Sequence, residues 1–168
     1  MSGATLQFVL AGADPCPLLG DDEPLPASAD RLVPWRRWLD AREQWPENVQ
    51  AAVAVANDVD VRELLADLPR LARIAVQFPK WTDGRAYSQA RLLRVRHRFA
   101  GELRAIGDVI PDMAPQLHRT GIDVAVLRAG ESIAVARRML GLIPEFYQGD
   151  AHEPRLRFAR ATAAAERP

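Results

Sequence analysis

Cysteine and histidine are scarce in this chain. One of its 168 residues is a cysteine, Cys16, and three are histidines. A single cysteine excludes an intramolecular disulfide, and it cannot form a cysteine cage for zinc or an iron–sulfur cluster within one chain. The histidines do not fall at metal-ligand spacing. We therefore expect no metal site, and this cysteine usage fits the reducing cytoplasm.

An excess of charge of one sign and long hydrophobic runs are also absent. Lys and Arg together number 22, as do Asp and Glu. Equal totals of the two signs do not indicate a basic face that would attract nucleic acid or an anionic membrane. No apolar stretch approaches the ~20 residues of a membrane helix, and the N-terminus lacks a signal-peptide pattern. We expect a soluble, cytoplasmic protein with no nucleic-acid or membrane partner.

Common nucleotide and nucleophile motifs are missing as well. The sequence contains neither a Gly-x-Gly-x-x-Gly turn after a strand nor a phosphate-binding loop, and it has no nucleophile elbow. We therefore predict no cofactor from the motifs. A flavin held by loops without a fixed pattern stays open, because flavodoxin-like sheets bind flavin in that way.

The chain does contain a repeated strand–helix pattern, in a composition that is 48% hydrophobic. Strand candidates recur every ~20 to 30 residues, as in βα units. They lie at 32–33, 51–56, 73–78, 102–106 and 123–127, and the helices expected after them span 35–45, 60–68, 85–97, 113–119 and 132–140. This alternation predicts an α/β fold with a single-domain parallel sheet of four or five strands, either doubly wound or half-barrel-like. A complete barrel needs ~250 residues and is excluded by length.

The two ends of the chain differ from this repeat. Residues 1–30 include a short strand candidate at 6–10, but 11–30 are rich in Gly, Pro and Asp, so we expect an irregular N-terminal segment. The α/β domain then spans 31–148, and 149–168 form a polar tail. Open parallel sheets have edges that need cover. Either the N-terminal segment or a second subunit can supply it, and we predict a homodimer.

Polar residues follow several of the expected strands. The carboxyl ends of parallel strands meet at one edge of a sheet, so these residues should gather there. They are Asn57, Asp58, Lys80, Thr82, Asp83, Arg85, Asp108 and Arg128. Lys80 and Arg85 beside a helix start form a candidate site for an oxyanion or a carboxylate. Asp83 and Asp108 are the candidate catalytic proton-transfer groups.

Each candidate also has a purely structural interpretation. Asp83 is an ordinary helix cap, and Arg85 can simply pair with Asp108. Arg104 is unusual in a covered strand. It needs a carboxylate partner such as Asp83 or Asp108, or a place at the sheet edge, unless it binds substrate. We predict that Asp83, Arg85, Arg104 and Asp108 share one charged cluster, since Arg104 and Asp108 have the same strand parity. Both interpretations stay open.

Further candidates lie on the helix after this loop. Tyr87 and Ser88 are positioned for proton transfer, although a tyrosine near a helix start more often packs against the core. Arg91, Arg94 and Arg98 share one helix face, which usually faces solvent. Spacing alone therefore does not distinguish Arg94 as a ligand-binding residue.

Three motifs closely resemble the bacterial domain-of-unknown-function family 934. They are FPKWTDGRAYSQARLLR at 78–94, GELRAIGDV at 101–109 and RTGID at 119–123, and the similarity runs from about Leu32 to a Phe-Tyr-Gln motif at 146–148. Genes of this family usually lie beside assimilatory sulfite reductase, and its members are commonly labelled as oxidoreductases of sulfite reduction. The resemblance adds Arg94 to the anion-binding candidates.

The resemblance implies a pathway rather than a reaction. One hypothesis is an accessory protein of assimilatory sulfite reduction that acts with sulfite reductase or its electron donor. The alternative is a small enzyme or oxidoreductase acting on an oxyanion or carboxylate metabolite, with Lys80, Arg85 and Arg104 as its ligands. The missing cofactor motifs favour the accessory protein, and the charged loop from Lys80 to Arg85 is compatible with both hypotheses.

Overall fold

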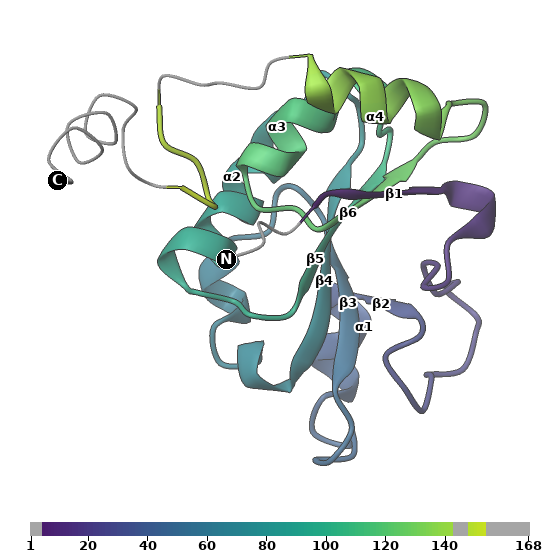
Figure 1. The fold of residues 1–168 in the computed structure, drawn as a ribbon. Helices are drawn as coiled ribbons and strands as arrows, with labels where there is room; N and C mark the ends of the chain where they lie inside the picture. The colour runs from purple at the N-terminus through teal and green to yellow at the C-terminus, as the bar shows by residue number, and fades with distance from the viewer. Residues whose placement is uncertain (1–4, 143–147, 154–168) are drawn as a thin grey trace, which may run out of the picture.

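Six parallel strands form one sheet in the computed structural model, which describes residues 5–142 and 148–153 (Figure 1). The strand order is β1-β6-β5-β4-β3-β2, and every neighbouring pair is parallel. The strands are β1 (Gln7–Leu10), β2 (Leu32–Pro34), β3 (Ala51–Val55), β4 (Leu71–Phe78), β5 (Glu102–Gly107) and β6 (Val124–Leu127). This confirms the α/β class and the parallel sheet.

The expected number of four or five strands is wrong. The sixth strand is β1, which confirms the short strand candidate at 6–10 in the segment otherwise expected to be irregular, and it pairs with β6 from Gln7–Val124 to Leu10–Leu127. No helix follows β1; a single turn at Ala11–Ala13 and a long loop lead to β2. β1 therefore lies outside the strand–helix repeat from which the number of strands was predicted.

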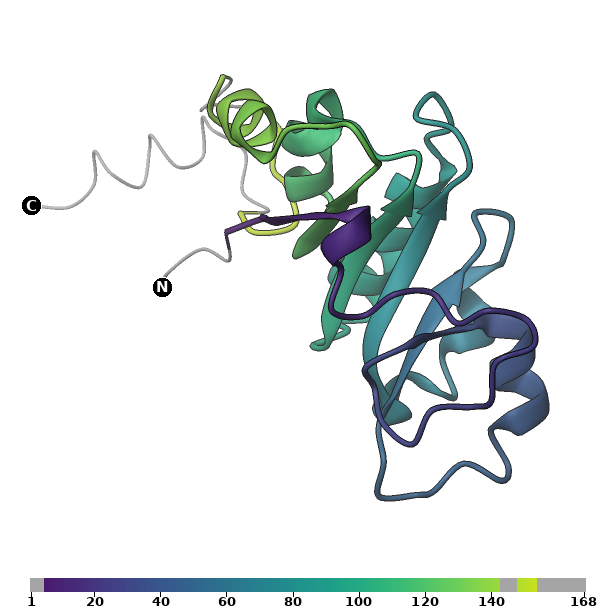
Figure 2. The same ribbon diagram turned by 90° about the vertical axis from the view of Figure 1, so that its right-hand side faces the viewer.

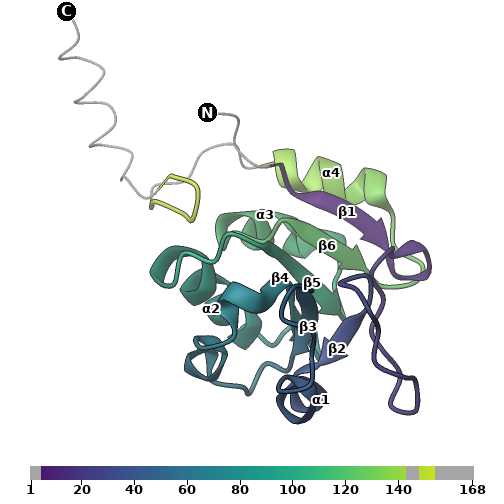
Figure 3. The same ribbon diagram turned by 90° about the horizontal axis from the view of Figure 1, so that it is seen from below.

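All four α-helices pack on one face of the sheet. They are α1 (Trp35–Ala41), α2 (Arg85–Arg91), α3 (Ala114–Arg119) and α4 (Ile133–Gly141). Strands β2 to β6 are neighbours in chain order, so each right-handed crossover steps in the same direction and leaves its connection on the same side. Figure 3 shows the sheet as an arc with the helices outside it. Of the two expected architectures, this arrangement is the half-barrel-like one.

The two sheet faces have different cores. The helix-covered face buries large side chains such as Trp38, Phe78 and Leu117. The opposite, inner face carries small ones such as Ala52 and Ala75, because a loop rather than a helix lies over it. That loop, residues 11–31, crosses the inner side of the sheet (Figure 2). We call it the inner loop.

The inner loop also covers one sheet edge. Leu19 N donates to Leu32 O at 2.9 Å, and Leu32 N donates to Pro17 O at 2.9 Å, so the loop pairs with β2. The opposite edge is β1, which has no further strand beside it in the described part of the chain. One of the two edges is therefore covered by the N-terminal segment itself.

Two expected helices differ in the structure. In place of the helix expected at 60–68 there are two 3-10 turns, Val61–Leu64 and Leu68–Arg70. Asp60 caps the first through Arg62 N at 2.9 Å, and Pro69 lies at the start of the second, where a proline is tolerated. The helix expected at 85–97 is α-helical to Arg91 and continues as a π turn, Leu92–Arg96. Within the described ranges, no helix is long and apolar enough to cross a membrane. Residues 146 and 147 of the tail motif, and 154–168 of the predicted tail, lie outside those ranges.

Candidate functional site

Polar contacts join the loops at the carboxyl ends of β3, β4, β5 and β6. Asn57 Nδ2 donates to Asp83 Oδ2 at 2.8 Å, and Trp81 N donates to Asp108 Oδ2 at 2.9 Å. Arg128 Nη1 donates to the other Asp108 oxygen at 2.7 Å. We call Asn57, Asp83, Asp108 and Arg128 the strand-end rim. The gathering predicted from the sequence is present for these four residues.

Asp83 and Arg85 form a closed pair on this rim. Arg85 Nε and Nη2 donate to the two Asp83 oxygens at 3.1 and 2.8 Å, and Arg85 N donates to Oδ1 at 3.2 Å. The guanidinium of Arg85 holds the pKa of Asp83 at about 2. The expected pairing of Arg85 with Asp108 is wrong, because Asp83 occupies its planar donor face. Asp83 is therefore ionised throughout the neutral pH range.

Asp108 has a different set of partners. The Trp81 N–H, and then Arg128, lower the pKa of Asp108 below its ordinary value. Arg128 is itself shared, since its Nε donates to Glu131 Oε1 at 2.9 Å. Asp108 therefore fixes the Trp81 backbone and joins the loops after β4, β5 and β6.

Arg104 lies outside the predicted charged cluster. It is 2% exposed on the inner face, where Nη1 donates to Glu102 Oε1 at 2.7 Å and Nη2 donates to Asp14 of the inner loop. The parity argument failed because β5 ends at Gly107, whose φ of +98° turns the chain before Asp108. A Cβ on Gly107 would lie 2.4 Å from Phe78 O, so this turn requires glycine.

Arg94 lies at the opposite, amino ends of the strands. Nε donates to Gly121 O at 3.1 Å and Nη1 to Gly101 O at 3.1 Å, while Nη2 pairs with the Asp123 carboxylate. Its side chain is 19% exposed, so it does not face solvent as the helical spacing indicated. Arg94 joins the π turn to the segments that precede β5 and β6, and the structure does not bring it to the strand-end rim.

The other candidates divide between surface and core. Lys80, Thr82 and Ser88 are exposed, and Trp81 between the first two is 53% exposed. Tyr87 packs edge-to-face on Phe78, with 4.9 Å between ring centroids. Burial raises the pKa of Tyr87 to about 12. Its phenol therefore keeps its proton at neutral pH and is a poor base.

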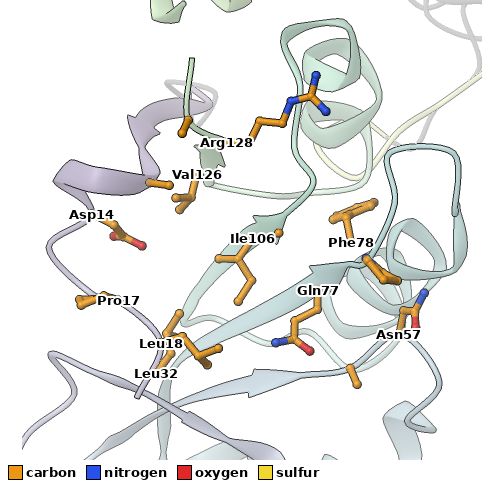
Figure 4. Close-up of a pocket in the computed structure, with 15 residues that line it drawn as sticks. Asp14, Pro17, Leu18, Leu32, Asn57, Gln77, Phe78, Ile106, Val126 and Arg128 are labelled. Carbon is orange, nitrogen blue, oxygen red and sulfur yellow. The ribbon is translucent and has the colours of Figure 1, made fainter. Parts of the chain in front are cut away.

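A cavity of about 540 Å³ lies beside the strand-end rim on the inner face (Figure 4). Pro17 and Leu18 of the inner loop line it beside Leu32 of β2, and Ile106 and Val126 line it from β5 and β6. Polar side chains in the lining are Asp14, Asn57, Gln77 and Arg128. Sequence reasoning missed this cavity because the inner loop has no periodicity. The one available signal was Gln77, a polar residue in the apolar run 74–78.

The loop beside the cavity is held by a buried glutamine. Gln89 Nε2 donates to Ala56 O at 2.8 Å and to Val59 O at 2.9 Å. This fixes the position of Asn57 between them. Among the described residues, no group of three or more His, Cys, Asp or Glu side chains is placed to hold a metal ion.

Comparison with known sequences identifies the family. No curated protein matches the chain. The family model described as "Bacterial protein of unknown function (DUF934)" matches residues 52–158, more than half of the 168 residues. The matched range includes strands β4 to β6, the whole strand-end rim and Gln77. The chain belongs to this family of bacterial proteins of unknown function.

Proposed function

We propose that this protein is a cytoplasmic accessory protein of assimilatory sulfite reduction, which docks on sulfite reductase or on its electron donor. The pathway follows from the genes that usually accompany the family. The docking surface is the loop between β4 and α2, with Lys80, Trp81 and Thr82 at its centre. We call these three residues the docking loop.

The observation that carries this proposal is the exposure of Trp81 on a fixed backbone. Trp81 is 53% exposed, its N–H is bound by Asp108, and Asp83 N donates to Lys80 O at 2.9 Å within the same turn. Tryptophan is enriched among the residues that dominate binding energy at protein interfaces. A loop that is already ordered loses little conformational entropy on association. An exposed tryptophan in this setting supports protein binding.

The alternative, a small enzyme acting on an oxyanion or carboxylate metabolite, has less support. Arg85 and Arg104 each bind a carboxylate of this chain, and the low pKa of Asp83 makes it a weak base. Lys80 is the remaining cation of the predicted set and is exposed in the docking loop. Loss of sulfite-dependent growth in a folded Arg85→Lys variant would favour the enzyme, since lysine keeps the charge without the two-pronged donor.

Direct binding tests the accessory function. The full chain is immobilised, and purified sulfite reductase and its purified electron donor are passed over it separately. We expect one of them to bind, and Trp81→Ala to weaken that binding by at least about tenfold, because truncating an interface hot spot typically costs ~2 kcal/mol or more. Val95→Ala is the control, since Val95 is also an exposed apolar residue, at 43%, and lies at the far end of the helical segment that follows the docking loop.

Two outcomes would contradict the proposal. One is failure of the wild-type chain to bind either protein. The other is equal binding by wild type and Trp81→Ala, which would show that the docking loop is not part of the interface.

A further inference from the structure

We infer that the inner-face cavity is a binding site for an uncharged, planar heterocycle that carries a lactam or imide edge. This site lies beside the docking loop but does not depend on it. Three properties of the cavity support this inference: its shape, the charge balance of its lining and the unused hydrogen-bonding groups in its wall.

The size and shape of the cavity suit a small organic ring system. Its volume of about 540 Å³ falls within the ~300–1,000 Å³ typical of ligand sites. The apolar lining is one continuous surface: Leu18 lies beside Leu32 at the β2 edge, and Ile106 and Val126 line the cavity from β5 and β6 (Figure 4). A flat ring that lies against this lining removes its own apolar surface and that of the lining from water.

The charged groups of the lining are already neutralised by this chain. Asp14 is bound to Arg104, and Arg128 is bound to both Asp108 and Glu131. A charged ligand would enter a largely apolar space without a free counter-ion, which is unfavourable. The cavity therefore favours an uncharged ligand, in contrast to the oxyanion expected from the loop sequence.

Gln77 supplies the specific recognition. It lies in β4 between the buried residues Val76 and Phe78, and its carboxamide makes no hydrogen bond with any described residue. Figure 4 shows the Gln77 side chain projecting from the strand into the cavity. A carboxamide presents one donor and one acceptor side by side, and a lactam or imide presents the complementary pair.

Asn57 adds a second contact at the same rim. Its Nδ2 is occupied by Asp83, so its orientation is set and its Oδ1 is available as an acceptor. Gln89 holds the backbone on both sides of Asn57 through Ala56 O and Val59 O. The cavity thus offers one amide held in place, Asn57, and one whose donor and acceptor are unused, Gln77, beside an apolar lining. These groups are the chemistry that recognises a heterocyclic edge.

Lumiflavin is a suitable probe because it is uncharged, planar and fluorescent, and has an imide edge. We expect saturable quenching of its fluorescence by the wild-type chain. Gln77→Leu should weaken binding about tenfold, since the variant keeps the side-chain volume but loses both hydrogen bonds. Gln116→Leu makes the same replacement on the exposed surface of α3 and should bind like wild type.

Two further arms complete the test, and the second of them does not depend on the folding of a variant. Val126→Phe fills the cavity from β6 and should abolish quenching. Wild-type protein with lumiflavin methylated on its imide nitrogen uses no variant at all, and this probe should bind about tenfold more weakly because the donor is blocked. The inference is overturned if wild type does not quench lumiflavin, if Val126→Phe still quenches it, or if the methylated probe binds as well.

Discussion

Arginine pairing is the main feature of this protein at the scale of single residues. The sequence pattern predicts Arg85 and Arg104 as anion ligands and the family resemblance adds Arg94, but each is bound to a different carboxylate in the structure. Their surroundings differ as well, from the exposed Arg85 to the 2% exposed Arg104. A guanidinium fork that is already satisfied by a carboxylate has lost its best geometry for a ligand. The three arginines therefore have separate structural roles.

The Asp83–Arg85 pair leads to a prediction about pH. Arg85→Ala should raise the pKa of Asp83 from about 2 toward its ordinary value of 3.8. Because the folded-state pKa of Asp83 is depressed, the pair stabilises the fold above about pH 4 and loses this effect as pH falls toward 2. Carboxyl NMR titration of wild type and variant checks the shift.

A matched control for this titration exists in the same chain. Asp60 and Arg62 have the same spacing and the same contact, and the pKa of Asp60 is also about 2 because Arg62 donates to it. Arg62→Ala should therefore raise the pKa of Asp60 and leave that of Asp83 unchanged. An unchanged Asp83 titration in Arg85→Ala would show that Arg85 does not control it.

At the scale of elements, the inner loop is held to the sheet by a buried ion pair. Asp14 and Arg104 are 5% and 3% exposed in their side chains, and Asp14 also accepts from Cys16 N at 3.0 Å. Arg73 donates to Ala29 O farther along the loop, and burial raises the pKa of the nearby Cys16 thiol. These contacts hold the inner loop in place beside the cavity. Arg104 contributes to the cavity by fixing Asp14, which is one of its lining residues.

Asp14→Ala should destabilise the protein by about 3 kcal/mol, the low end for breaking a buried pair, because Arg104 keeps Glu102 as a second partner. Urea unfolding measures this loss of free energy. Asp22→Ala removes an exposed carboxylate from the same loop and should change stability by less than ~0.5 kcal/mol. Equal effects of the two substitutions would mean that the buried pair does not anchor the loop.

At the scale of the whole molecule, the two sheet edges are unequal. The inner loop pairs with β2, whereas β1 presents its outer side without a strand beside it in the described structure. Exposed strand edges are common sites of association between chains. We therefore propose that the predicted homodimer forms through β1.

The mass measured by light scattering at micromolar concentration should be about twice 18.6 kDa. Backbone groups alternate along a strand, and Gln7 N is bound to Asp123 O, so the Leu10 N–H points away from β6. Leu10→Pro removes this donor at a residue whose φ of −84° is close to that of proline, and should weaken the dimer. Leu10→Ala keeps the N–H and should remain dimeric, and a wild-type mass of one chain would refute the proposal.

Much of the fold was predictable because it depends on local pattern. Apolar runs such as 51–55 and 74–76, each followed by a helical or turn pattern, identify a parallel α/β sheet without any tertiary information. The sequence also predicted correctly that Asn57, Asp83, Asp108 and Arg128 meet, since the carboxyl ends of parallel strands share one edge. These conclusions follow from the geometry of strands and crossovers alone.

Three features were decided only by the tertiary structure. The strand candidate at 6–10 became the sixth strand of the sheet only through its pairing with β6, more than a hundred residues away in the chain. The partner of Arg104 is Asp14, separated from it by 90 positions, and charge pattern gives no means of choosing among 22 acidic residues at such distances. The cavity exists because a loop without periodicity lies over the inner face. Local sequence determined the helices and strands. Long-range packing determined which groups remain available to a ligand, because it balances the burial of apolar surface against the cost of unpaired charge.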